Sequence, residues 1–274
     1  MKNFAYLNTS EISLDFENKL RKFADKCMGN VKRYICFFDE ESICPNIPKI
    51  YYAKKGNQIV GFLSIYVFDK LNFEFCIFVH PDYRRLGIGT QLFKNFYTTQ
   101  KPALVSASVS PDNKPCIAFL NSFDFEFAST ELLMRLNAED FALTESLIQS
   151  SLSNDFITNE DFSVSYMEDD DCFKLILDEK EVGQCFISVI GHNINRTLNY
   201  CISDVYINED YRGRHLGCVF LYNVLSKLFD TNNHIILHVV KENVPAYNLY
   251  KKIGFKVTET SLTYEKNMPA HKCE

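Results

Sequence analysis

The chain has 274 residues and a formal net charge of -6 at pH 7, from 29 basic and 35 acidic residues. That length corresponds to about two domains, and 46% apolar with 23% charged residues is the composition of a folded protein. The acidic balance disfavours a general nucleic-acid-binding role. No apolar run approaches the roughly 20 residues that span a bilayer, and the N-terminus lacks a signal-peptide core. We therefore expect a cytoplasmic protein with no nucleic-acid or membrane partner.

The first half is predicted to begin with a helix over residues 10–28, because apolar residues recur there at mainly helical spacing. A hairpin follows around Lys55-Gly56-Asn57. The remaining predicted elements of this half are strands at 49–54, 58–68, 73–79, 103–109 and 131–137, with helices at about 86–97 and 114–122.

The second half repeats this order, with a reduced opening helical region. Its predicted elements are strands at about 173–177, 181–190, 199–207, 234–240 and 257–266, with helices at about 215–229 and 244–253. Strands with interspersed helices predict an α/β fold with a mixed sheet (α+β) in each half. The ten cysteines contain no C-x-x-C pair, so we expect small buried hydrophobes and no metal site.

A strand-turn-helix segment occurs twice, as FCIFVHPDYRRLGIGTQLFKNF from Phe75 and as ISDVYINEDYRGRHLGCVFLYNVL from Ile202. Downstream, NKPCIAFLNSFDFE in the first half is matched by NVPAYNLYKKIGFK in the second. A period this long indicates a duplicated domain and not a solenoid. We therefore expect two tandem domains, at residues 1–140 and 141–274.

Each turn opens a helix whose first backbone N–H groups lack partners within the helix, which favours an anion such as phosphate. The glycines of Arg-x-x-Gly-x-Gly would let a pyrophosphate approach the backbone. The pattern is neither a P-loop nor a Rossmann fingerprint. Four basic side chains lie at the two turns: Arg84, Arg85, Arg212 and Arg214.

With its flanking segments, this turn resembles the acetyl-CoA-dependent N-acetyltransferases of the GNAT superfamily, in two tandem copies covering almost the whole chain. The resemblance implies that the turn amides bind the pyrophosphate of acetyl-CoA, the co-substrate. In the second copy His215 replaces the first glycine, which either weakens the phosphate cradle or brings the imidazole to a phosphate. The implied coenzyme-binding residues are Phe78, Val79, Arg84, Arg85, Leu86, Gly87, Ile88, Gly89, Thr90, Asn113, Tyr206, Ile207, Arg212, Gly213, Arg214, His215, Leu216, Gly217, Cys218, Asn243 and Tyr250.

The family's N-x-x-A-x-x-L-Y-x-x-x-G-F helix fits the second copy from Asn243 to Phe255, whereas the first copy has Leu120 in place of the tyrosine. By resemblance Tyr250 is the general acid that protonates the leaving thiolate. The alternative is a tyrosine that only packs in the helix. The backbone N–H groups near Phe78-Val79 and Tyr206-Ile207 would hold the thioester carbonyl.

The general base is expected to be Asp204 or Glu74, the carboxylates on the two equivalent strands. An even number of positions separates each carboxylate from the arginine of the following turn, Arg84 or Arg212, which places the two side chains on the same face of an ideal strand. By resemblance, the family's bulge in this strand can reverse that placement. Either residue could instead pair across strands. Asp204 is preferred because Tyr250 is in the same half. His80 and His238 are interpreted as ordinary loop or strand histidines.

These patterns predict an N-acetyltransferase acting on a primary amine of a small molecule or peptide, with chemistry in the C-terminal domain. Two alternatives are catalysis in the N-terminal domain and a non-catalytic coenzyme A-binding module. The acidic charge of the chain favours a cationic acceptor. We expect the protein to be a monomer or a homodimer. Variable loops are expected to shape the acceptor site and to determine which amine binds.

Overall fold

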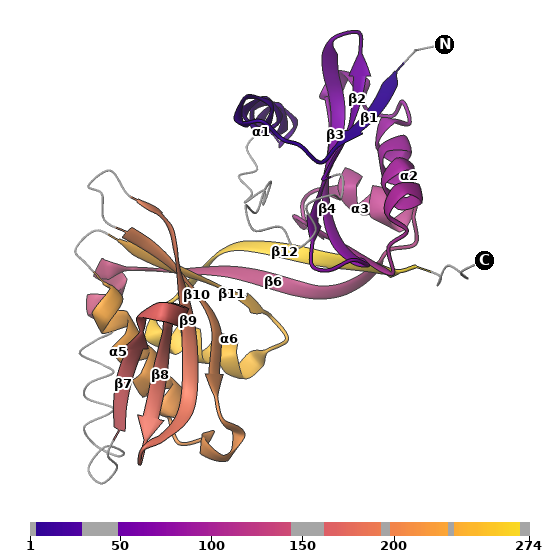
Figure 1. Cartoon of the computed structure of the whole chain (residues 1–274). Coiled ribbons are helices and arrows are strands. Elements are labelled where there is room, and N and C mark those ends of the chain that lie inside the picture. Colours follow the sequence, from indigo (N-terminus) through magenta and orange to yellow (C-terminus); the bar gives the residue numbers. More distant parts are fainter. Residues whose placement is uncertain (1–3, 29–48, 144–161, 193–197, 230–232, 269–274) are drawn as a thin grey trace. The chain divides into compact units, whose positions relative to one another are not determined.

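The structure is a computed structural model that describes residues 4–28, 49–143, 162–192, 198–229 and 233–268 (Figure 1). The chain divides into two compact units. The first unit comprises Met1–Ala128 and Leu262–Glu274, and the second comprises Ser129–Ser261. Each unit is a mixed sheet with helices packed against it, which confirms the expected fold class. None of the helices in the described residues is long and apolar enough to cross a membrane.

The first unit has a mixed sheet with the strand order β1-β2-β3-β4-β5-β12. The β4–β5 pair is parallel, and the pairs β1–β2, β2–β3, β3–β4 and β5–β12 are antiparallel. Its elements are β1 (Ala5–Thr9), α1 (Leu14–Met28), β2 (Ile50–Lys55), β3 (Gln58–Val67), β4 (Asn72–Val79), α2 (Ile88–Gln100), β5 (Leu104–Val109), α3 (Lys114–Asn121) and the end of β12 (Lys256–Asn267).

Helices cover both faces of this sheet (Figure 1). An aromatic core joins α2 and α3 to one face, where the rings of Phe93 and Phe123 lie 4.6 Å apart. On the other face, Leu20 and Ala24 of α1 pack against Phe62, and all three are fully buried. The spacing of Leu20 and Ala24 places both on one stripe of the helix. Burial of that stripe holds α1 on the sheet.

The second unit has the strand order β6-β11-β10-β9-β8-β7. Its core is formed by the sheet together with two helices, and it includes Phe220, Leu221 and Ile253, which have no exposed surface. The elements are β6 (Glu126–Asn137), β7 (Phe162–Met167), β8 (Cys172–Leu177), β9 (Lys180–His192), β10 (Leu198–Ile207), α5 (Leu216–Leu228), β11 (His234–Val240) and α6 (Val244–Ile253).

The last strand of each sequence repeat extends into the other repeat's unit. Strand β6 ends the first repeat but pairs with β11 over Glu131–Asn137 in the second unit. Strand β12 ends the second repeat but pairs with β5 over Leu262–Asn267 in the first unit. The division at residues 140 and 141 therefore describes the sequence repeats, whereas each compact unit contains a strand from both.

Most elements lie within a few residues of the predicted bounds, and the differences have local causes. Helix α1 begins at Leu14 because the Ser13 hydroxyl accepts a hydrogen bond from the backbone N–H of Phe16 (3.3 Å). The short strands β1 and β7 were not predicted. The reduced opening region expected in the second copy falls mainly on residues 144–161, outside the described residues.

Candidate functional site

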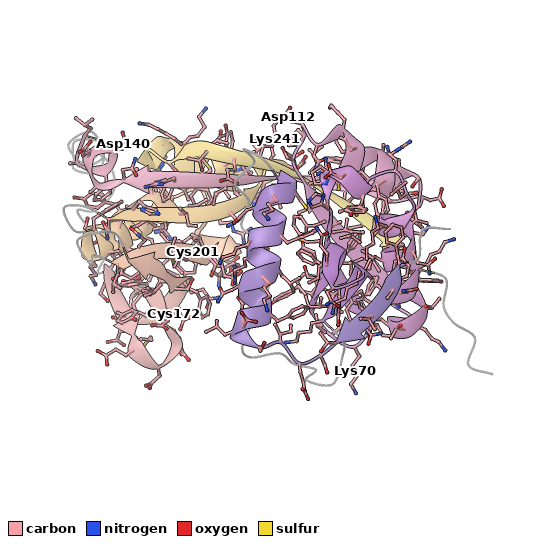
Figure 2. All side chains as sticks on the ribbon, turned by 90° about the horizontal axis from the view of Figure 1, so that it is seen from above. Lys70, Asp112, Asp140, Cys172, Cys201 and Lys241 are labelled. Atoms are coloured by element: carbon pink, nitrogen blue, oxygen red, sulfur yellow. The ribbon has the colours of Figure 1, made fainter. Side chains whose placement is uncertain are left out.

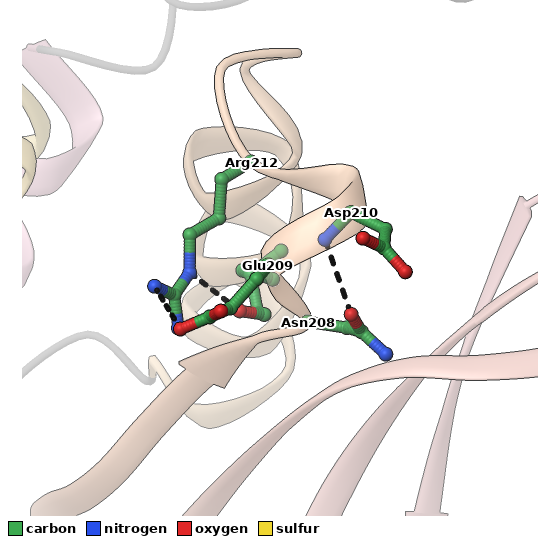
Figure 3. A network of polar contacts seen from close by, with 5 residues as sticks. Asn208, Glu209, Asp210 and Arg212 are labelled. Carbon is green, nitrogen blue, oxygen red and sulfur yellow. Dashed lines mark hydrogen bonds and ion pairs between the residues drawn. The ribbon is translucent and has the colours of Figure 1, made fainter.

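The two repeated turns have the same local structure. Each strand is followed by a single turn of 3-10 helix, Pro81–Tyr83 after β4 and Glu209–Tyr211 after β10. His80 Nδ1 accepts a hydrogen bond from the Asp82 backbone N–H (3.3 Å), and Asn208 Oδ1 accepts one from that of Asp210 (3.2 Å) (Figure 3). His80 is thus a capping residue of the turn, as its interpretation as a loop histidine implied.

Both turns place two residues in the left-handed region, at equivalent positions. In the first turn these are Arg85 (φ 61°) and Gly87 (φ 80°), and in the second they are Gly213 (φ 76°) and His215 (φ 58°). A non-glycine residue in this conformation costs roughly 1–2 kcal/mol. Each turn therefore contains one glycine and one strained residue, in opposite order. The replacement of glycine by His215 leaves the backbone of the turn unchanged.

The two equivalent arginines brace the turns. Arg84 Nε donates to the carbonyl of Val79 (3.2 Å), and Arg212 Nε donates to that of Ile207 (2.9 Å) (Figure 3). Arg84 also donates to the carbonyl of Cys27 at the end of α1 (2.8 Å). These guanidinium groups are therefore held against the end of the preceding strand, which gives them a structural role beyond the anion-binding role expected for them.

The helix that follows each turn starts without a side-chain cap, since neither Gly87 nor His215 makes a capping hydrogen bond. Such a start offers backbone N–H groups and a positive dipole end to an anion. A Cβ on Gly89 would lie 3.4 Å from the Phe119 ring, and a Cβ on Gly217 would lie 3.2 Å from Leu249 Cδ2. These glycines let α3 and α6 pack closely on the helix start. Both helix starts therefore present backbone N–H groups that no N-cap side chain satisfies.

A gap opens in each sheet next to its turn. Strand β4 pairs with β5 only over Asn72–Glu74, and β10 pairs with β11 only over Tyr200–Ile202. The later residues of β4 and β10 run on without pairing on that side. Glu74 therefore lies in the paired part of β4, opposite Tyr66 of β3 and Ser106 of β5, before the gap begins. Its position is that of a cross-strand pairing residue.

Only the second unit has a bulge in this strand. The register between β10 and β9 shifts between Ser203 and Tyr206, so Asp204 and Val205 lie opposite the single residue Cys185. Asp204 has a φ of 47°. By contrast, β4 pairs with β3 without interruption over Phe73–Val79. A bulge redirects the backbone groups of a strand, and here it does so at the edge of the gap.

Tyr250 lies in the buried core of the second unit. Its ring packs against Phe255, with the ring centres 6.0 Å apart, and 6% of its surface is exposed. Burial, together with the nearby Cys185 thiol, raises the pKa of Tyr250 to about 12. Burial and neighbours that include Asp204 likewise raise the pKa of Cys185 to about 12. The Cys185 thiol thus interacts electrostatically with both Tyr250 and the bulge residue Asp204.

Three other predicted coenzyme-binding side chains have local structural roles. Asn113 Oδ1 accepts from the backbone N–H of Cys116 (3.2 Å), and Asn243 Oδ1 accepts from that of Ala246 (3.3 Å), so both asparagines cap their helices. Cys218 is buried, and burial raises the pKa of its thiol. Cys218 therefore packs as a small apolar side chain.

One pair of side chains was not anticipated from the sequence. His238 Nδ1 lies 3.5 Å from Glu131 Oε1, and the interaction with His238 is the main cause that lowers the pKa of Glu131. The two residues belong to different repeats and meet because β6 pairs with β11. No sequence signal pointed to this pairing. In the described part of the chain, no group of three or more potential metal ligands is found.

A sequence model of the acetyltransferase (GNAT) family matches residues 17–125 and again residues 138–255. The chain belongs to this family. The double match confirms the tandem GNAT repeat proposed from the turn and helix motifs, and it supports acyl transfer as the general activity. A search of curated protein sequences finds no match.

Two solved structures share the fold along nearly the whole chain. A GCN5-related N-acetyltransferase from Sphaerobacter thermophilus superposes with a TM-score of 0.67 at 12% identity, covering 96% of this chain and 95% of that chain. A tandem GNAT protein from the clavulanic acid biosynthesis pathway superposes with a TM-score of 0.63 at 12% identity, covering 98% and 100%. At these identities the likeness shows the fold alone.

Proposed function

We propose that this tandem GNAT protein transfers an acetyl group from acetyl-CoA to a primary amine of a small molecule or peptide, and that the second unit performs the transfer. The observation that carries this proposal is the bulge of β10 at Asp204–Val205, beside the gap between β10 and β11. The bulge and the gap lie on the same unit as Tyr250. The first unit has the gap without the bulge.

The residues of the second unit would divide the work as follows. The start of α5 at Leu216 and Gly217 would hold the pyrophosphate, on a turn braced by Arg212. Acetyl-CoA supplies an acetyl group activated as a thioester. Backbone N–H groups at the bulge and at Tyr206-Ile207 would polarise its carbonyl and stabilise the developing oxyanion.

Tyr250 would protonate the departing thiolate. A phenol with a pKa of about 12 is fully protonated at neutral pH, so the proton is present when the thiolate leaves. Leu120 occupies the equivalent place in the first unit and has no proton to give. Asp204 would attract a cationic amine, because its carboxylate borders the gap on an exposed part of the strand.

The first unit would bind coenzyme without performing the transfer. It keeps the uncapped helix start at Gly87, but it has an unbroken β4 and an apolar Leu120. Its other face is closed by α1, whose Phe23 ring lies 5.8 Å from the Phe62 ring and 6.1 Å from the His80 ring. The first unit thus supports a structural coenzyme A-binding role, which is the second candidate function.

A matched pair of charge substitutions tests this assignment. Gly87→Asp and His215→Asp each place a carboxylate at the N-cap of the coenzyme helix, at a left-handed position that aspartate tolerates. The isosteric Gly87→Asn and His215→Asn add no charge and serve as controls. Thiol release from acetyl-CoA is measured with a panel of primary amines, alongside acetyl-CoA binding by calorimetry.

We expect His215→Asp to lower kcat/KM for acetyl-CoA by at least about tenfold relative to His215→Asn, through repulsion of the pyrophosphate. Gly87→Asp should leave turnover within about twofold of its asparagine control, since kcat/KM reports only transition-state binding at the site of transfer. Loss of turnover only in Gly87→Asp would give the chemistry to the first unit. Binding without acetyl transfer to any amine would favour the binding module.

A further inference from the structure

His238 occupies a special place on β11. The parallel pairing of β10 with β11 ends at Ile202 and Leu237, so His238 is the first residue of β11 beside the gap. Leu237 and Val239 face the core formed with α5 and α6, and alternation along the strand puts His238 on the opposite face. Its side chain is 47% exposed. Asp204 lies just past the same pairing on β10, so the two residues border the gap from opposite sides.

Glu131 holds the imidazole from the neighbouring strand. Its Oε1 lies 3.5 Å from His238 Nδ1, and its side chain is 37% exposed. One further hydrogen bond joins β6 and β11 next to this pair, because the backbone N–H of Lys241 (Figure 2) donates to the Thr130 carbonyl (2.8 Å). A carboxylate at Nδ1 fixes the ring orientation, keeps a proton on that nitrogen and leaves Nε2 to accept another.

We propose that His238 is the general base that deprotonates the acceptor amine, with Glu131 as the residue that positions it. This proposal rests on the proposed acetyl transfer in the second unit. It assigns the acceptor to the exposed face at the β10–β11 gap, and it assigns Asp204 to attract the ammonium. Because Glu131 comes from the first repeat, the second repeat alone would lack half of the pair.

The charged groups on the elements beside His238 are consistent with this role. They are Glu126, Glu131 and Arg135 on β6, Asp204 on β10, and Lys241 and Glu242 after β11. Of these, Glu131 contacts the imidazole. The pair is not repeated in the first unit, where β5 has Ser108 at the equivalent position opposite Thr263 of β12. This asymmetry matches the asymmetry of the bulge.

The proton balance closes with these groups. The alkylammonium gives one proton to Nε2 of His238, which releases it to solvent. The amine lone pair then forms the C–N bond, the nitrogen gives its second proton to His238, and the C–S bond breaks with its electron pair on sulfur. Tyr250 protonates the thiolate and recovers a proton from His238 through water. One amide, one thiol and one released proton result.

The test compares His238→Gln, Glu131→Gln and Asp204→Asn in the full chain, with His234→Gln as the matched control. His234 lies on the same face of β11 as His238. It is the first residue of the strand, so the paired segment Ile235–Leu237 separates it from the gap. Acetyl transfer to an alkylamine that the wild type accepts is followed by thiol release between pH 6 and pH 10. The KM for acetyl-CoA and the unfolding temperature are measured for each variant.

We expect His238→Gln to lower kcat/KM for the amine by about 100-fold or more at pH 7, with the defect shrinking at higher pH as free amine accumulates. Glu131→Gln should lower kcat for the amine by on the order of tenfold and leave the KM for acetyl-CoA and the unfolding temperature unchanged, because the imidazole loses the carboxylate that orients it. A merely structural pair would change the unfolding temperature instead of kcat. His234→Gln should leave kcat/KM unchanged.

A His238→Gln variant with wild-type kcat/KM would overturn the proposal and leave the proposed function standing. The same holds if Asp204→Asn alone produces the pH-dependent loss, since the base would then be Asp204. A wild type that acetylates no amine would overturn the proposed function and this proposal together. The wild-type activity measured first thus separates the two failures.

Discussion

Replacing the hydroxyl of Tyr250 should make the protein more stable and much less active. The ring is almost fully buried in the core of the second unit. Among the residues that the structure describes, no hydrogen-bond partner is found for its hydroxyl. A buried polar group without a protein partner is unusual, and the proposed role as general acid would account for it. Tyr250→Phe keeps the ring and its packing on Phe255 and removes only the oxygen.

The size of both effects follows from this burial. Leaving a buried hydroxyl unsatisfied costs about 1–3 kcal/mol, so Tyr250→Phe should raise the free energy of unfolding by about 1 kcal/mol and Tm by a few degrees. The pKa of the folded state, about 12, exceeds the ordinary value of 10.0. The unfolded state therefore releases its proton first, and wild-type stability falls between pH 10 and 12. The phenylalanine variant should lose less stability over this range.

Turnover should fall by roughly 100-fold to 10,000-fold, the usual contribution of a positioned general acid. The KM for acetyl-CoA should stay nearly unchanged, because the proton is transferred only as the thiolate leaves. Tyr247→Phe on the same helix is the matched control, since the Tyr247 ring packs at the edge of this core with Lys251 Nζ 5.5 Å from its centre. Wild-type turnover in Tyr250→Phe would refute the assignment of Tyr250 as the acid, and a clear loss of stability would refute the inference that its hydroxyl is buried without a partner.

Three further predictions concern the glycines, a histidine and the exchanged strand. Gly87→Ala should lower the free energy of unfolding by about 1–2 kcal/mol, because residue 87 has a φ of 80° and the added Cβ meets no atom within 4 Å, so the cost is conformational. Gly89→Ala adds a Cβ at ordinary contact distance and should cost less, as measured by urea unfolding. Burial lowers the pKa of His234, so stability should fall as pH drops below about 6.5, and less so in His234→Gln. Ending the chain at residue 261 removes the partner of β5, and the first unit should aggregate through that edge.

Much of the fold could be predicted from local patterns. The helices and strands follow apolar periodicity, and the turn motifs indicated both the duplication and the family. The exchange of β6 and β12 could not be predicted in this way, because a strand's hydrophobic pattern is the same whichever neighbour it pairs with. The sequence therefore predicts Glu131 only as the start of a strand, and the contact of Glu131 with His238 depends on that exchange.

The site shows the same division between local and long-range information. That His215 would adopt the backbone of Gly87 was not evident from sequence, since a histidine at φ 58° contradicts its local preference. The roles of Arg84 and Arg212 as braces depend on strand-end carbonyls five residues earlier in the chain. The bulge at Asp204 is a property of the β9–β10 register and carries no fixed sequence signature.

The exchanged strands offer a physical reason for keeping two unequal repeats in one chain. A single repeat could in principle keep its last strand, but here the second unit needs β6 to cover the edge of β11. The same strand supplies Glu131 beside the gap. Selection for acetyl transfer in the second unit would then preserve the first repeat, although the first repeat has no bulge in β4 and has Leu120 in place of the tyrosine. On this argument the first repeat survives because it completes the other unit's sheet and positions its base.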